Sequence, residues 1–319
     1  MITQVPGFAV GHASDYKNVT GCTVILCPPE TIGSIDVRGS AAGTRQIDAL
    51  LGLHIVNEVH AVVISGGSAF GLDASGGVME YLEEQGRGFD VAVTRVPIVP
   101  TAVIYDLSVG NCRARPDKAS GYAACQAAHT EPHGDGSIGA GTGASVGKLL
   151  GIKNATKGGL GTSFQTGPNG LKVGALTVVN AFGDVVDPAT GEIIAGARTA
   201  PDSKEFADAV RLIRQGVVRK RFGEPNTTIG VIATNARLTR EEAQKIAQIG
   251  HNALARTIRP VHTLFDGDIV FVLARPEVKT DMHLLGLLGE KALEEAIISA
   301  VKNAHGLGVL PSYQDLRGE

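Results

Sequence analysis

The apolar residues of the chain fall into short runs that predict β-strands. Each run is rich in β-branched residues and is bounded by Gly, Pro, Asn or Asp, as expected of strands that end in tight turns. The run from Val185 to Ile194 is interrupted by Asp187-Pro188 and Gly191, which predicts a hairpin. The six predicted strands are Cys22–Cys27, His60–Ile64, Phe89–Thr94, Val173–Val179, Thr228–Thr234 and Asp268–Ala274.

Other segments carry apolar residues at helical spacing and predict five helices. Thr239 is a suitable first cap for one of them, and Glu242, three residues further on, completes a capping box. The segment that starts at Leu284 repeats its apolar residues every three or four positions. The predicted helices are Ala69–Glu84, Ala119–His129, Ser203–Arg214, Thr239–Arg256 and Leu284–Asn303.

The order of these elements indicates an α/β protein. Strands and helices are grouped rather than strictly alternating, so two arrangements fit. One is a pair of sheets packed face to face with helices outside, and the other is a parallel doubly wound sheet. Glycine supports a tightly packed layered fold, because 42 of 319 residues are Gly without a period. That share is about twice the average of ~7% and favours tight turns and close backbone contacts.

Composition narrows the class of protein further. With 43% hydrophobic residues the chain can form a sizeable core, and its length fits one large domain or two ordinary ones. The net charge is −3, Lys and Arg form no block, and aromatic residues are few, so no nucleic acid partner is expected. No apolar run predicts a membrane span, and the first residues do not resemble a secretory signal. The four cysteines form no CxxC pair. We therefore expect a soluble cytoplasmic protein without a cofactor or metal.

The junction Asn226-Thr227-Thr228 is the most informative candidate for chemistry. It lies between a polar turn, Arg221–Pro225, and the apolar run Ile229–Ala233. A Thr at the start of a strand can become an N-terminal nucleophile once the chain is cut before it. Its hydroxyl then attacks, and its new α-amino group helps to move the proton. The same residues are also typical of an ordinary turn.

Polar residues elsewhere fit such a nucleophile. Asp266 and Asp268 precede a predicted strand, and residues i and i+2 of an extended chain point to one face. Two adjacent carboxylates raise the pKa of one of them, which suits a proton relay, although a simple turn before a strand is the more common origin of such a sequence. Lys148 would activate a hydroxyl if it were desolvated. Asn180, at the end of a strand, would donate its amide to an oxyanion.

Two glycine-rich segments leave alternatives open. Residues Gly143–Gly147 match the G-x-S-x-G nucleophile elbow with Ser145 as nucleophile, which needs a strand before and a helix after. The same loop is equally suited to line a pocket. Residues Ser65–Asp73 follow a strand and open a helix, so their amides are suited to hold an anion or to form a tight turn. An uncut serine hydrolase and a non-catalytic small-anion-binding protein are therefore the alternative readings.

Six motifs occur in one order along essentially the whole chain. They are Gly7–His12, Ser65–Asp73, Gly139–Ala144, Val179–Asp184, Asn226–Thr228 and Asp266–Asp268. On these motifs the chain resembles the DmpA-type self-cleaving aminopeptidases, which include β-aminopeptidases and aminohexanoate-oligomer (nylon oligomer) hydrolases. The junction Asn226-Thr227 and the sequence Asp266-Gly267-Asp268 are similar to the nylon-oligomer branch, whereas the aminopeptidase branch tends to have Gly-Ser and Ser-x-Glu there.

The resemblance implies a fold and a processing event. The fold is an αββα sandwich of the N-terminal-nucleophile-hydrolase type, formed by residues 1–319 as a single domain. Self-cleavage between Asn226 and Thr227 would leave pieces 1–226 and 227–319. The processed units would assemble into a homo-oligomer, from a dimer up to a tetramer.

The resemblance also assigns roles to residues. Thr227 is the nucleophile, Asp266 and Asp268 balance its ammonium, Lys148 lowers the cost of the alkoxide, and Asn180 stabilises the oxyanion. Lys153 and Lys157 compete for the role of Lys148. The expected substrate is a small peptide or an ω-amino-acid amide oligomer, cleaved through an acyl-enzyme, and an acyltransferase remains an alternative. The residues implied to bind substrate are Gly67, Ser68 and Tyr105.

Overall fold

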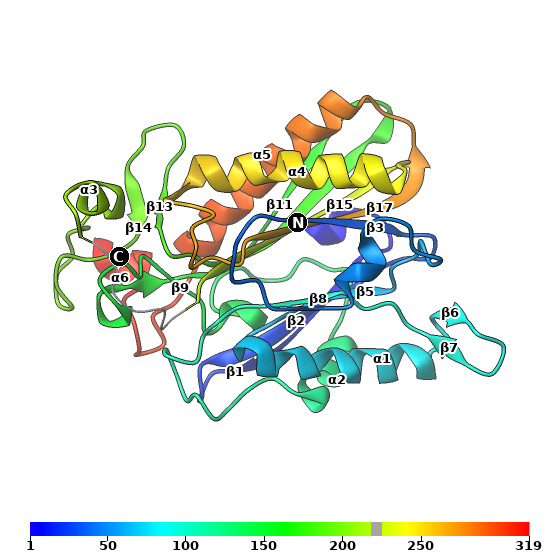
Figure 1. The fold of residues 1–319 in the computed structure, drawn as a ribbon, viewed down its shortest axis with the longest axis horizontal. Helices are drawn as coiled ribbons and strands as arrows, with labels where there is room; N and C mark the ends of the chain where they lie inside the picture. The colour runs from blue at the N-terminus through cyan, green and yellow to red at the C-terminus, as the bar shows by residue number, and fades with distance from the viewer. Residues whose placement is uncertain (218–224, 319) are drawn as a thin grey trace.

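Two five-stranded sheets lie face to face at the centre of the protein (Figure 1), in a computed structural model that describes residues 1–217 and 225–318. The first sheet, in spatial order, contains β1 (Ala9–Asp15), β2 (Thr20–Leu26), β5 (Ala61–Ser65), β8 (Thr101–Val103) and β4 (Thr44–Arg45). The second sheet contains β11 (Gly159–Thr166), β12 (Lys172–Asn180), β15 (Thr227–Ala236), β17 (Ile269–Val278) and β3 (Ile32–Val37).

Helices cover the outer face of each sheet. The helices α1 (Ala74–Glu84) and α2 (Lys118–Gln126) pack on the first sheet, and α4 (Arg240–Thr257) and α5 (Met282–Lys302) pack on the second. Figure 1 shows the two helix pairs on opposite sides of the sheets. The layers are therefore αββα, which confirms the sandwich and rules out the doubly wound alternative.

The space between the sheets holds a continuous apolar core. Ile25 and Val62 from the first sheet meet Leu176, Val231 and Phe271 from the second, and all five are fully buried. Burial of one such side chain stabilises a fold by about 1.5–3 kcal/mol. A second core fills the space between the second sheet and its helices. The strand β15 is therefore buried on both faces, and its middle, Ile229–Ala233, is apolar.

The register of the second sheet brings separate parts of the chain to one end. β12 pairs antiparallel with β15, so its last residue, Asn180, lies opposite the first residue of β15, Thr227. β15 pairs parallel with β17, and Ile229 lies opposite Ile269. The end of β12 and the starts of β15 and β17 therefore meet at the same end of the sheet, where these strands enter or leave it.

Most elements lie where the sequence predicts them, with two errors. The predicted strand Phe89–Thr94 is wrong, because the backbone reverses at Ala92, which has a φ of 71°, and forms a small hairpin. The predicted helix Ser203–Arg214 is wrong in its first half, because Asp208 has a φ of 60° and caps a helix that begins only at Ala209. The hairpin over Val185–Ile194 is confirmed. The predicted turn at Arg221–Pro225 lies, except for Pro225, outside the described residues.

The remaining elements are short. They are β6 (Phe89–Asp90), β7 (Arg95–Val96), β9 (Ser145–Val146), β10 (Thr156–Lys157), β13 (Asp184–Val186), β14 (Ile193–Ala195), β16 (Ile258–Arg259), α3 (Ala209–Arg214), α6 (Tyr313–Arg317) and the 3₁₀ helices Ile2–Gln4, Ile47–Leu50, Ser68–Asp73, Gly139–Gly141, Ile152–Asn154 and Pro168–Gly170.

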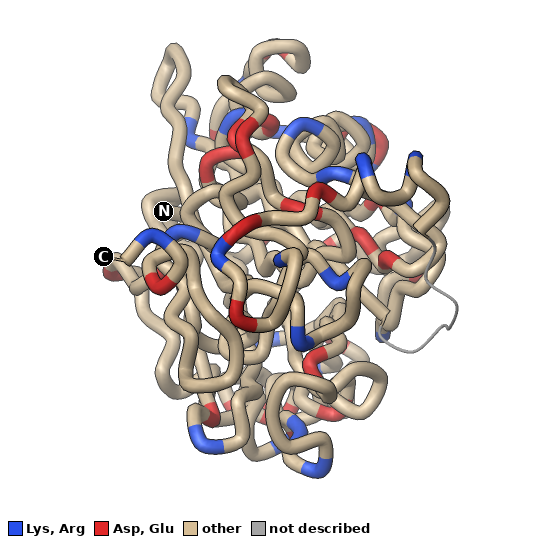
Figure 2. Tube along the Cα trace, turned by 90° about the vertical axis from the view of Figure 1, so that its left-hand side faces the viewer, with Lys and Arg blue, Asp and Glu red and all other residues tan. Residues whose placement is uncertain are grey.

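Charged residues of both signs are interspersed along the chain in the view of Figure 2. None of the helices within residues 1–217 and 225–318 has both the length and the apolar character that a bilayer crossing needs.

The capping box at the start of α4 gives a first testable prediction. The Thr239 hydroxyl accepts a hydrogen bond from the Glu242 amide at 3.2 Å, and the Glu242 carboxylate accepts one from the Thr239 amide at 2.8 Å. We expect Thr239→Ala to lower the free energy of unfolding by about 1 kcal/mol, as a lost N-cap typically does. Thermal unfolding would measure the loss, and Thr239→Ser, which keeps a capping hydroxyl, should retain most of the wild-type stability.

Candidate active site

The peptide bond between Asn226 and Thr227 is held in an extended conformation against the loop before β17. The Asn226 amide donates to the Phe265 carbonyl at 2.8 Å, and the Gly267 amide donates to the Asn226 carbonyl at 2.7 Å. The Thr227 hydroxyl donates to the same carbonyl oxygen at 2.5 Å. The Asn226 carbonyl is therefore polarised by a backbone N–H while the adjacent hydroxyl lies against it.

The carboxylate of Asp268 lies beside the start of β15. Its Oδ1 accepts a hydrogen bond from the Thr228 amide at 2.8 Å, and its Oδ2 accepts from the amide and the Nδ1 of His262 at 3.1 and 2.8 Å. A buried carboxylate needs such donors, because an unpaired charge in the interior is very costly. Asp268 is thereby fixed one residue from the candidate nucleophile.

Asp266 lies near Asp268 and has a raised pKa. Its oxygens accept hydrogen bonds from the Phe182 amide at 3.2 Å and from the amide and hydroxyl of Thr263 at 2.9 and 2.6 Å. Burial, and next the nearby Asp268 carboxylate, raise the pKa of Asp266 to about 6. The sequence predicted a raised pKa from the pairing of the two carboxylates, which is confirmed, although burial is the larger cause.

Lys148 hydrogen-bonds Asn180, which lies opposite Thr227 in the pairing of β12 with β15. The Lys148 Nζ donates to the backbone carbonyl of Asn180 at 2.9 Å and to its side-chain Oδ1 at 2.8 Å. The Asn180 Nδ2 donates to the Tyr105 carbonyl at 3.1 Å. Because Lys148 Nζ and the Ser145 amide both donate to Oδ1, the hydrogen bonds define which end of the Asn180 amide is the donor. Asn180 therefore presents its NH₂ group on the side of Tyr105.

The competing lysines are separated by their contacts. Lys157 is fully buried, but its Nζ donates to the carbonyls of Thr142 and Ala144 at 2.9 and 2.8 Å. Burial lowers the pKa of Lys157 to about 7, although Asp106 opposes the shift. Lys153 is exposed. Of the three, Lys148 is the lysine that hydrogen-bonds Asn180.

The nucleophile-elbow reading of Ser145 is wrong in its structural context. Ser145 lies in the two-residue strand β9, and the chain then forms a turn at Leu149 and Leu150 instead of the helix that the elbow needs. Its hydroxyl is fully buried and lies 3.4 Å from the Oδ1 of Asn180. Within the described ranges no histidine hydrogen-bonds this hydroxyl. Ser145 therefore helps to hold Asn180 and lacks the histidine partner of a Ser-His-Asp triad among the described residues.

The loop that contains Gly67 and Ser68 uses its amides within the protein. The Gly67 amide donates to the buried Asp106 carboxylate at 2.7 Å, and the Ser68 amide donates to the Ile104 carbonyl at 3.0 Å. The hypothesis of a small-anion-binding protein requires free amides in this loop, and these two amides are not free. Asp106 directly follows Tyr105, whose carbonyl accepts a hydrogen bond from Asn180. The loop is therefore connected to the candidate site through Asp106 and Tyr105. Substrate binding by Gly67, Ser68 and Tyr105 stays a prediction.

Two features of the site were missed in the sequence. The Gly267 amide on the Asn226 carbonyl arises from a parallel pairing of Asn226 with Asp266, and a backbone N–H has no sequence signature. His262 is not among the candidate residues of the sequence analysis, although it lies six residues before Asp268 and binds its carboxylate. A histidine that close to a candidate carboxylate pair was the available signal.

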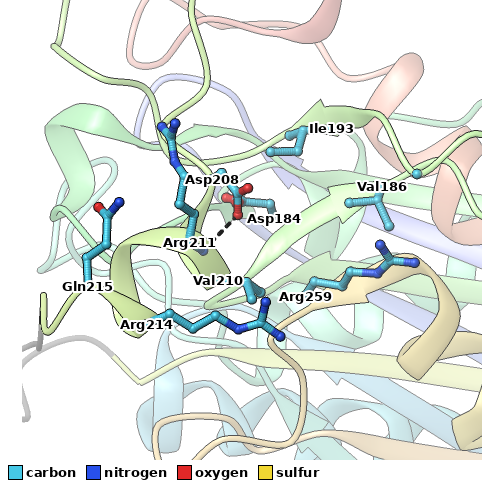
Figure 3. A pocket seen from close by; sticks show the side chains of 10 residues that line it. Asp184, Val186, Ile193, Asp208, Val210, Arg211, Arg214, Gln215 and Arg259 are labelled. Atoms are coloured by element: carbon cyan, nitrogen blue, oxygen red, sulfur yellow. Dashed lines mark hydrogen bonds between the residues drawn. The ribbon is translucent and has the colours of Figure 1, made fainter.

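The candidate site is buried in the uncut chain and is separate from an open cavity. Thr227, Asp266, Asp268, Lys148 and Asn180 are each at most 2% exposed. A cavity of about 640 Å³ opens between α3 and the β13–β14 hairpin, with arginine side chains around it (Figure 3), and none of these five residues lines it. The candidate site is therefore identified by the hydrogen bonds among its residues and not by an open cavity.

The two packed sheets with their helices, and a threonine at the start of a central strand, define a protein with the N-terminal-nucleophile-hydrolase fold. A solved structure supports this assignment: the L-aminopeptidase D-Ala-esterase/amidase of Ochrobactrum anthropi, described as a variant of that fold, matches with a TM-score of 0.71 at 18% identity. The match covers 99% of this chain and 92% of that one. At this identity the likeness concerns the fold alone.

The chain belongs to peptidase family S58, whose sequence profile matches residues 1–310. An uncharacterized aminopeptidase of Mycobacterium tuberculosis is 40% identical, over 99% of this chain and 97% of the relative. The 6-aminohexanoate-oligomer endohydrolase of Paenarthrobacter ureafaciens is 31% identical, over 93% and 84%. The resemblance to the DmpA-type family is thus confirmed, and the protein is a hydrolase of amide or peptide bonds.

Proposed function

We propose that this protein cuts its own chain before Thr227 and then hydrolyses small amides with Thr227 as the N-terminal nucleophile. The observation that carries the proposal is the geometry of the Asn226 carbonyl. This carbonyl lies against the Thr227 hydroxyl and accepts a hydrogen bond from the Gly267 amide. A hydroxyl next to a polarised carbonyl is the arrangement that an acyl shift needs.

In the self-cleavage step, the Thr227 Oγ attacks the Asn226 carbonyl carbon. The Gly267 amide stabilises the oxyanion, and the hydroxyl proton passes to the Thr227 nitrogen as the C–N bond breaks. The resulting ester between Asn226 and Thr227 is hydrolysed by water, which releases the Asn226 carboxylate and a free Thr227 hydroxyl. The new α-amino group of Thr227 then lies next to Thr228, whose amide is held by Asp268.

In the mature enzyme, the Thr227 hydroxyl attacks the substrate amide. The α-amino group, with a reference pKa of about 8, accepts the proton and passes it to the leaving amine. Asp266 and Asp268 balance the ammonium, Lys148 offsets the developing alkoxide, and the Asn180 NH₂ group donates to the oxyanion. Water then hydrolyses the acyl-enzyme and regenerates Thr227.

The descriptions of the relatives support a proposal for the substrate class. Relatives described as aminopeptidases and as 6-aminohexanoate-oligomer endohydrolases support small peptides and ω-amino-acid amide oligomers as substrates. Identity is higher with the mycobacterial aminopeptidase than with the oligomer hydrolase, so we propose peptides as the natural substrate class.

We also propose that the protein acts in the cytoplasm as a homo-oligomer, from a dimer of processed units up to a tetramer. The exposed apolar side chains of Leu53, Ile55 and Val93 support burial against another copy. Light scattering coupled to gel filtration tests the assembly, and a monomer at all concentrations would contradict it.

The raised pKa of Asp266 leads to a prediction for self-cleavage. If the reaction needs the ionised carboxylate, the rate should fall about tenfold per pH unit below about pH 6, because Asp266 takes up a proton there. Hydrolysis by the mature enzyme should already decline below about pH 8, because the base of that reaction is the free Thr227 α-amino group, which takes up a proton there. The rate of self-cleavage is measured on uncut chain from cell-free synthesis, by following its intact mass between about pH 4.5 and 8. A cleavage rate that is independent of pH in this range would contradict the role of Asp266.

The first experiment is the intact mass of the purified protein under denaturing conditions, together with an assay on aminoacyl anilides. Two masses that start at Met1 and Thr227, with turnover of the anilide, are expected. A single full-length mass that persists after warm incubation would contradict self-processing. If an added amine acceptor were acylated faster than substrate was hydrolysed, the enzyme would instead be an acyltransferase.

A further inference from the structure

The carboxylate of Asp268 is oriented by a residue to which the reaction above gives no role. His262 donates to Asp268 Oδ2 twice, from its backbone amide at 3.1 Å and from its ring Nδ1 at 2.8 Å. The other oxygen, Oδ1, accepts from the Thr228 amide at 2.8 Å. Because Asp268 accepts hydrogen bonds from these groups, the proton of the His262 ring is assigned to Nδ1. The Asp268 carboxylate therefore joins the start of β15 to an imidazole.

The backbone of His262 is held in an unfavourable conformation to reach this contact. Its φ is 53°, in the left-handed region that residues other than Gly rarely adopt. Such a conformation is unfavourable and persists only where the surrounding contacts require it. In this conformation both the backbone amide and the ring Nδ1 of His262 reach the Asp268 carboxylate. The strain is thus tied to the orientation of this carboxylate.

A second histidine supports the ring from behind. The His251 ring lies edge-on to the His262 ring, with centroids 4.8 Å apart and an angle of 74° between the planes. Burial, as the largest cause, lowers the pKa of His251 to about 4, so this ring is neutral at pH 7. Its Nε2 hydrogen-bonds the Asp36 carbonyl at 3.1 Å. The buried His251 ring therefore fixes the plane of His262 without adding a charge.

We propose that His262 is a positioning residue for Asp268, so that Thr227, Asp268 and His262 act together in amide hydrolysis. This inference rests on the proposed role of Thr227. By holding Oδ2, His262 keeps Oδ1 directed at the backbone of Thr228, next to the nitrogen that becomes the α-amino group. Without the imidazole, Asp268 loses its only side-chain donor among the described residues and is held by two backbone amides alone, so its orientation toward that amine is less strictly fixed.

The test separates the imidazole from the strained backbone. His262→Gly removes the ring and accepts a positive φ without strain. His262→Asn also tolerates this φ, and its side-chain NH₂ can replace the Nδ1–H donor. We expect His262→Gly to lower kcat about 10- to 100-fold with KM nearly unchanged, as when a group that orients a reactive side chain is removed. His262→Asn should retain most of the activity.

Chemical rescue provides the second readout. The His262 side chain is 19% exposed, so free imidazole has access to the space that the Gly variant leaves. We expect added imidazole to raise kcat of His262→Gly severalfold and to leave the wild type unchanged. Asn169→Gly is the matched control, because Asn169 also has a positive φ, of 57°, and lies away from the site in the turn before β12. Its activity should equal that of the wild type.

Two results would overturn the inference. One is a His262→Gly enzyme with unchanged kcat, and the other is an equal loss in the Gly and Asn variants without imidazole rescue. If the Gly variant does not fold, His262→Asn is compared with His262→Asp, which has the same size but cannot donate when ionised. Equal activity of this pair would also overturn it. Failure of the proposed function is distinct, because the wild-type chain itself would then remain uncut or inactive.

Discussion

We expect Thr227→Ala to yield one uncut chain that has lost amide hydrolysis. The substitution removes the hydroxyl that lies 2.5 Å from the Asn226 carbonyl oxygen, and the chain keeps no other nucleophile at this position. Removal of a catalytic nucleophile typically costs about 10⁴-fold or more in kcat. Intact mass under denaturing conditions measures cleavage, and anilide turnover measures activity. A Thr227→Ala protein that is both processed and active would contradict the mechanism.

Two companion variants at this position separate chemistry from folding. Thr227→Ser keeps the hydroxyl and should still be cut and active. Thr227→Val keeps the β-branched shape that suits the first residue of β15, so it should fold but remain uncut. A native melting temperature for the Val variant would show that the loss of activity comes from the missing hydroxyl.

Ser145→Ala is the control for the competing nucleophile. The Ser145 amide, which the substitution keeps, makes the 3.0 Å hydrogen bond to Asn180, whereas its hydroxyl is at 3.4 Å. We therefore expect normal cleavage and activity. A Ser145→Ala enzyme that is inactive, beside an active Thr227→Ala enzyme, would restore the uncut serine hydrolase.

The sequence predicts those elements whose apolar pattern is set by two-sided burial. Val173–Val179 and Thr228–Thr234 correspond to β12 and β15, which form the middle of the second sheet. Phe89–Thr94 fails because its β-branched residues are exposed in a hairpin, so no core selects an extended run there. The first half of Ser203–Arg214 fails because a local cap at Asp208 overrides the helical spacing.

The candidate site depends on contacts that local patterns do not determine. Lys148, Asn180 and Thr227 are far apart in sequence, and the register of β12 with β15 brings two of them together. Register follows from the whole sheet and is not written in any one segment, so the assignment of these residues relied on the family resemblance. The Gly267 amide and His262 remained unassigned because a backbone N–H has no sequence signature and because the contact of His262 with Asp268 depends on a loop conformation.

Lys148→Met should show how much the buried charge contributes. Methionine has a similar length and is apolar, so it fits a side chain that is 2% exposed, but it removes both hydrogen bonds to Asn180. The NH₂ group of Asn180 is the proposed oxyanion donor, and its orientation depends in part on those bonds. We expect kcat to fall about 10²- to 10³-fold, the range for loss of one oxyanion donor.

The other two lysines of this region make the result specific. Lys153→Met changes an exposed side chain and should leave activity and stability unchanged. Lys157→Met removes the donor to the Thr142 and Ala144 carbonyls, so it should lower the melting temperature more than Lys148→Met does. Any Lys157→Met protein that still folds should keep more activity than Lys148→Met, because Asn180 retains its lysine. Lys148→Met with near-normal kcat, beside an inactive but folded Lys157→Met, would transfer the catalytic role to Lys157.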